Sequence, residues 1–152
     1  MIMENLELIE KAIHAVIKET AWSITWNTLN AIKAYRRGVV AELEEYQFGW
    51  RIEKEITPEQ AKKSYRLPKI AGIHGSCGYG SACIVADNFC SLSTCGGHGV
   101  DIEIKNGEII FTPDAEASCQ SWGDLHEESE DFPIDDETRR FRRTERLKKA
   151  LL

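Results

Sequence analysis

The sequence predicts an α+β fold, with a helical N-terminal half, a small antiparallel sheet in the second half and a C-terminal helix. Residues 5–20 repeat apolar side chains with the period of a helix, and Asn106-Gly107 stands between two runs of alternating apolar residues. Residues 136–151 begin with acids and end with basic side chains, as the helix dipole favours. The 152 residues are enough for an ordinary core, so we expect a single domain spanning 1–152.

The N-terminal part, residues 5–66, is predicted to be mainly helical. The apolar stripe of the first helix is Leu6, Ile9, Ile13, Val16 and Ile17. A second helix is expected over residues 23–37, with Trp22 and Trp26 four apart on one face that we assign to the core. Residues 39–46 are read as further helix, residues 48–56 show strand alternation, and Thr57-Pro58 starts a short helix that ends before Pro68.

Residues 68–113 form a predicted β region rich in cysteine and glycine. Its expected strands are residues 69–73, 82–86, 100–104 and 108–111. The Asn-Gly pair between the last two tolerates positive φ, which indicates a tight hairpin. An acidic connection, residues 114–135, then leads to the terminal helix, residues 136–151. We expect its narrow apolar stripe, Phe141, Leu147 and Leu151, to face the protein or a partner subunit.

Composition limits the classes of function. The formal net charge is -6, so general nucleic-acid binding is not expected. The apolar runs are short and the N-terminus carries glutamates where a secretory leader needs a basic start, which predicts a cytoplasmic protein without membrane insertion. The five cysteines would then be reduced, as buried side chains, metal ligands or a nucleophile.

The stretch from His74 to Gly99 holds four of the five cysteines and is the predicted site. Its glycines allow successive backbone N–H groups to point into one concavity, an arrangement that binds anions. The ligand would be a small anion or a nucleotide. The predicted ligand-binding residues are His74, Gly75, Ser76, Gly78, Tyr79, Gly80 and Ser81.

A zinc site is a second interpretation of the same stretch. Zinc needs four thiolate or imidazole ligands, and strand ends would have to bring them together because the stretch has no CxxC pair. The predicted ligands are Cys77, Cys90, Cys95 and His98. The plainer alternative is that these cysteines are packed in the core.

A thiol enzyme is the third interpretation, with Cys77 as nucleophile and His98 as base. The order of Cys77, His98 and the Asn-Gly hairpin resembles the papain superfamily of peptidases and amidases, where a cysteine precedes a histidine at the start of a strand. That resemblance implies a cysteine hydrolase. The chain departs from the pattern at Gly78 and Gly80, which stand where the family's long helix would begin.

The absence of a complete triad, cofactor fingerprint or paired zinc motif favours a small cytoplasmic binding or inhibitory protein without catalysis, of a kind common among phage and mobile-element regulators. We expect it to capture a nucleotide-like or anionic ligand, or to block a basic protein partner with its acidic surface. A cysteine hydrolase and a zinc-stabilised structural or interaction module remain the alternatives. The apolar spacing on the first helix also leaves a homo-oligomer open.

Overall fold

The computed structural model describes residues 2–20, 22, 25–26, 28–30, 32–33, 51–52, 73–76, 82–85, 88–94, 98–116, 122, 128–129 and 131–152. In chain order its elements are α1 (Ile2–Glu19), β1 (Arg51–Ile52), β2 (Ile73–Ser76), β3 (Ala82–Val85), β4 (Phe89–Ser93), β5 (Gly99–Lys105), β6 (Glu108–Pro113) and α5 (Asp136–Ala150). The described residues between 25 and 33 are also helical. The predicted α+β class is confirmed.

The strands form one antiparallel sheet in the order β1-β2-β3-β4-β5-β6, so each strand pairs with its neighbours in the chain. The predicted hairpin between β5 and β6 is confirmed. Lys105 lies opposite Glu108, and the two turn residues have positive φ, 53° at Asn106 and 76° at Gly107. These are the dihedral signs that a two-residue turn needs to match the twist of its strands.

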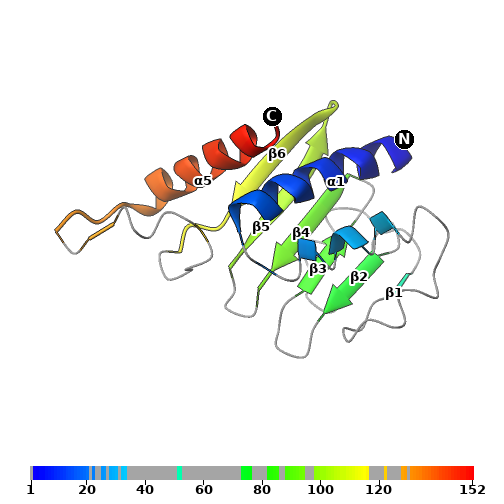
Figure 1. Ribbon diagram of the computed structural model, residues 1–152, viewed down its shortest axis with the longest axis horizontal. Coiled ribbons are helices and arrows are strands. Elements are labelled where there is room, and N and C mark those ends of the chain that lie inside the picture. Colours follow the sequence, from blue (N-terminus) through cyan, green and yellow to red (C-terminus); the bar gives the residue numbers. More distant parts are fainter. Residues whose placement is uncertain are drawn as a thin grey trace.

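Side chains alternate along β4–β6, so one face is apolar and the other is mixed, with Phe89 and Ile110 on the same face as its polar residues. Cys90, Ile102 and Phe111 lie opposite one another across the three strands, and all are buried. On the other face the matching row is Ser91, Asp101 and Thr112. α1 and α5 pack side by side along β5 and β6, as Figure 1 shows. The core therefore lies between this pair of helices and the apolar face.

The first helix buries the stripe that its periodicity predicts. Leu6, Ile9, Ile13 and Val16 are fully buried and Ile17 is partly buried. Of the two tryptophans assigned to the core, Trp22 is buried and packs edge to face on Trp122 with ring centroids 5.0 Å apart. Trp26 is 52% exposed, so its assignment to the core was wrong. Spacing alone placed it on the face of Trp22, but the burial of that face does not extend to residue 26.

The terminal helix is confirmed, and of its predicted stripe Leu147 is buried and Leu151 is partly buried against the core, but the assignment of Phe141 was wrong. Phe141 is 65% exposed, and the buried side chains of α5 are Arg139, Arg143 and Leu147. These three recur every four residues and therefore share one face, whereas Phe141 lies on the opposite side. Asp135 caps the helix by accepting a hydrogen bond from the Thr138 N–H at 2.7 Å. This bond lowers the pKa of Asp135 below its ordinary value.

Several predicted elements fall outside the described residues. These are the helix over 39–46, the short helix from Thr57, and the part of the first predicted strand before Ile73. β1 lies within residues 48–56, where the sequence predicts strand alternation. Among the described residues, no helix has the length and apolar character needed to cross a membrane.

Candidate functional site at one end of the sheet

The strand ends that border the predicted site all lie at one end of the sheet. The register places Ser76, Ala82, Ser93 and Gly99 in one row across β2 to β5. The Asp114 N–H donates to the Gly99 carbonyl at 2.9 Å, which extends the row to the residue after β6. In an antiparallel meander, alternate connections emerge at the same end. The chain therefore leaves β2, β4 and β6 at this end of the sheet.

The carboxylate of Asp114 is the centre of the polar contacts here. Its Oδ1 accepts hydrogen bonds from the Trp122 Nε1–H at 2.9 Å and the Gly99 N–H at 3.1 Å. Its Oδ2 lies 3.3 Å from both Arg143 Nη1 and the Glu116 backbone nitrogen. The side chain is 18% exposed. These contacts fix the orientation of the carboxyl group.

His98 lies against two carboxylates at once. Its Nδ1 is 3.2 Å from Asp114 Oδ2 and 3.2 Å from Glu116 Oε2. The imidazole is 12% exposed, whereas the Glu116 side chain is 65% exposed and reaches the group from the solvent side. The three side chains each offer an atom that can ligate a metal, and these atoms lie within 4.8 Å of one another.

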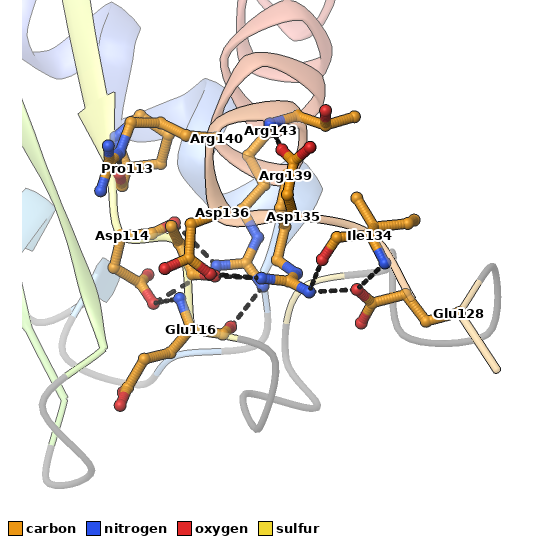
Figure 2. Close-up of polar contacts among 12 residues, drawn as sticks. Pro113, Asp114, Glu116, Glu128, Ile134, Asp135, Asp136, Arg139, Arg140 and Arg143 are labelled. Atoms are coloured by element: carbon orange, nitrogen blue, oxygen red, sulfur yellow. Dashed lines mark hydrogen bonds and ion pairs between the residues drawn. The ribbon is translucent and has the colours of Figure 1, made fainter. Parts of the chain in front are cut away.

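α5 holds this end of the sheet through Arg139, Arg140 and Arg143, which we call the arginine cluster (Figure 2). Arg143 is fully buried and donates to the Asp114 carbonyl at 2.7 Å and the Glu116 carbonyl at 2.8 Å. Its guanidinium carbon lies 5.0 Å from the ring centroid of Trp122, within cation–π range. Arg140 donates from Nε to the Pro113 carbonyl at 3.2 Å.

Arg139 extends the cluster toward the acidic connection. Its guanidinium donates to the Ala115 carbonyl at 2.6 Å and the Ile134 carbonyl at 2.7 Å, and it pairs with Glu128 and Asp136. Burial, the largest influence, disfavours the charged form, but the hydrogen bonds and charges of the two acids together outweigh it. The pKa of Arg139 is therefore raised above its ordinary value. The pairing keeps a buried arginine charged and holds Glu128 and Ile134 against α5.

A hollow of about 280 Å³ opens beside this cluster. The ends of β4–β6 line it, where Leu92, Gly99, Val100 and Pro113 lie. The polar residues of the lining are Ser93, Asp101, Thr112, Asp114 and Arg140. Asp101 accepts a hydrogen bond from the Ser91 hydroxyl at 2.8 Å. The hollow thus combines donors and acceptors held on strand ends, as small-molecule sites commonly do.

The structure describes only some of the predicted site residues. His98 lies in the carboxylate group just described. Cys90 is fully buried opposite Ile102 on the apolar face. The backbones of His74, Gly75 and Ser76 form β2. The remaining predicted site residues, Cys77, Gly78, Tyr79, Gly80, Ser81 and Cys95, lie outside the described residues. The three predicted sets of site residues therefore stay predictions.

Sequence reasoning missed Asp114, Glu116 and the arginine cluster. A usable signal existed for Asp114. Counting outward in both directions from Asn106-Gly107 places Gly99 opposite Asp114, so an acid had to lie beside the residue that follows His98. No comparable pattern indicates Arg143, because a basic residue in a charged helix is usually solvent-exposed.

Comparison of the chain with protein-family models, curated proteins and solved structures found no match.

Proposed function

We propose that the protein is a small cytoplasmic binding protein without catalytic activity, which captures a nucleotide-like or other small anionic ligand in the hollow at the end of the sheet. The observation that carries the proposal is the composition of the hollow, whose lining includes an arginine, two hydroxyl side chains and two carboxylates, Asp101 and Asp114. Arginine is the preferred partner of phosphate and carboxylate groups. A carboxylate can accept hydrogen bonds from hydroxyl or amino groups of the same ligand.

Arg140 is the residue that supports an anionic ligand. Within the described part of the chain its hydrogen bond is made through Nε to the Pro113 carbonyl, and this bond orients the side chain beside the hollow. A guanidinium has five N–H donors, so its Nη groups can donate to a ligand while Nε holds the Pro113 carbonyl. The negative charge of Asp114 in the same wall is offset by Arg143, 3.3 Å away.

The rigid setting also supports binding. Ser93 and Thr112 lie on strands of the sheet. Arg140 lies on α5, and Arg139 and Arg143 of the same helix are buried. Side chains placed on such elements lose little conformational freedom when a ligand binds, which favours affinity. The volume of about 280 Å³ is just below the range of about 300–1,000 Å³ usual for ligand pockets, so it suits a small ligand.

Thermal denaturation with inorganic phosphate and a panel of nucleoside mono- and triphosphates tests this function. A ligand at a hundred times its Kd adds about 2.7 kcal/mol, which raises Tm by about 5–10 °C in a protein of this size. Arg140→Gln should abolish the rise. Arg142→Gln, which removes the same charge from an exposed position of α5 outside the hollow, should keep it. An unchanged Tm across the panel, or an equal rise in Arg140→Gln, would contradict the proposal.

A second candidate function is the cysteine hydrolase with Cys77 and His98. The observation that favours it is the contact between His98 Nδ1 and Asp114, since a carboxylate on one ring nitrogen orients a catalytic imidazole. An alkylating reagent at neutral pH tests it. The hydrolase requires that Cys77 react much faster than Cys90 and that His98→Ala remove the difference. Equal rates at Cys77 in both proteins would exclude the mechanism.

A further inference from the structure

We propose that His98, Asp114 and Glu116 bind a divalent transition-metal ion of the zinc class. This site differs from the cysteine-based set predicted from the sequence and shares only His98 with it. It shares Asp114 with the wall of the proposed anion site, but Arg140 takes no part in it. An imidazole with two carboxylates is a ligand set that suits zinc and similar borderline cations.

The spacing of the three ligand atoms supports the assignment. His98 Nδ1 lies 3.2 Å from Asp114 Oδ2 and 3.2 Å from Glu116 Oε2. Nitrogen and oxygen ligands at zinc bond lengths, placed at tetrahedral angles, are about 3.3–3.4 Å apart. An ion between the three side chains would therefore reach normal bond lengths after a small adjustment of the exposed Glu116 side chain.

The charges make a cation at this position favourable. Two carboxylate oxygens converge on the same ring nitrogen, and one N–H cannot point well at two acceptors. Both distances also exceed the 2.7–2.9 Å usual for charge-assisted hydrogen bonds. A metal ion accepts the Nδ1 lone pair and binds both oxygens, so it satisfies all three groups together.

Asp114 is also positioned as metal-binding carboxylates usually are. Its Oδ1 is held by Trp122 Nε1 and the Gly99 N–H, at 2.9 and 3.1 Å, so Oδ2 faces His98. Arg143, the nearby cation, makes its shorter contacts to backbone carbonyls, at 2.7 and 2.8 Å, and lies 3.3 Å from Oδ2. Hydrogen bonds of this kind orient a ligating carboxylate from outside the coordination sphere.

The test uses the full chain, stripped with a chelator and then titrated with Zn²⁺ or Co²⁺. Saturating Zn²⁺ should raise Tm by about 5–10 °C at a hundred-fold excess over Kd. Glu116→Gln should weaken binding at least about tenfold, the lower range for loss of a group that orients a ligand. His98→Gln should abolish it, whereas His14→Gln, on the exposed face of α1, should leave it unchanged. Arg143 contacts the backbone of Glu116, so Glu116→Gln does not remove that contact.

Co²⁺ spectra separate this site from a cysteine site. Bound Co²⁺ should show visible bands without the intense near-ultraviolet absorption of thiolate ligands. Intense thiolate absorption, binding that persists in both His98→Gln and Glu116→Gln, or no response of the wild-type protein to either ion would each overturn the proposal. The Arg140→Gln variant should bind the metal normally, so failure of the anion site and failure of the metal site are distinguishable.

Discussion

Arg143→Met should destabilise the protein strongly, because the guanidinium connects α5 to the segment that follows β6. The arginine is fully buried, donates to the carbonyls of Asp114 and Glu116, and lies beside the Asp114 carboxylate. Methionine is similar in length and fills the space with apolar atoms, so the change removes the charge and the donors without leaving a large cavity. It leaves Asp114 without its cation.

The expected loss is about 3 kcal/mol. Removing one partner of a buried ion pair typically costs 3–5 kcal/mol. The lower end applies because the Asp114 side chain is 18% exposed, so water can take over part of the lost interaction. For a protein of this size the loss corresponds to a fall in Tm of about 6–12 °C.

Urea denaturation followed by far-ultraviolet circular dichroism measures this loss. Arg142→Met is the matched control, since it changes the adjacent exposed arginine and should alter stability by less than about 0.5 kcal/mol. Arg143→Lys should give an intermediate loss, because an ammonium keeps the charge but does not have the planar fork that reaches two carbonyls. If Arg143→Met were within about 0.5 kcal/mol of the wild type, the buried arginine would not hold this end of the sheet.

Two further changes test the fold around the site. In Gly99→Ala the new Cβ would overlap the Leu92 carbonyl oxygen, so we expect a loss of about 1–3 kcal/mol in urea denaturation. Full stability of this variant would mean that β4 and β5 pair in another register. Asp135→Ala should lower Tm at about pH 7 by removing the cap that accepts from Thr138, whereas Asp135→Asn should largely retain it. Because the folded pKa of Asp135 is lowered from 3.8, its contribution is present above that value and is lost as pH falls through the lower one. A Tm difference between Asp135→Ala and the wild type that stayed constant down to about pH 2 would contradict the role of this charge.

The parts of the fold that the sequence predicted best are those set by local rules. The apolar period of residues 5–20 identified the buried face of α1, because a surface helix must cover the core with one stripe. Asn106-Gly107 identified the β5–β6 hairpin for an equally local reason, since few other pairs accept positive φ at both positions. Neither inference needed knowledge of a distant contact.

The parts that were missed depend on contacts between distant segments. Phe141 was assigned to the buried stripe of α5 because burial of phenylalanine is favoured over burial of arginine. The structure buries Arg139 and Arg143 instead, since backbone carbonyls after β6 and nearby acids accept their hydrogen bonds. Whether an arginine can be buried depends on such partners, and residues 24 or more positions away in the chain supply the carbonyls here.

The candidate site, like the fold, was predictable from the sequence only where the signal was local. His98 could be identified from the sequence because it lies in an unusual cluster of cysteine, histidine and glycine. Its carboxylate partners could not be identified by composition, since acids are frequent throughout a chain with 25 of them. The register of the hairpin was the one available route to Asp114, and it led to a residue beyond the predicted end of the strand.

Asp114 belongs both to the contacts that stabilise this end of the sheet and to the proposed metal site. Its Oδ1 and backbone carbonyl belong to the contacts with Trp122, Gly99 and Arg143, while its Oδ2 faces His98. A cation bound to Oδ2 would repel the guanidinium 3.3 Å away but strengthen the order of the segment that Arg143 holds. The contacts of Arg143 to the backbone carbonyls are shorter than its contact to Oδ2. We therefore expect the ordering of residues 114–116 to outweigh the repulsion between the ion and the guanidinium. Arg143→Met should then weaken metal binding even though Arg143 is not a ligand, because residues 114–116 would no longer be held in the geometry that the ion requires.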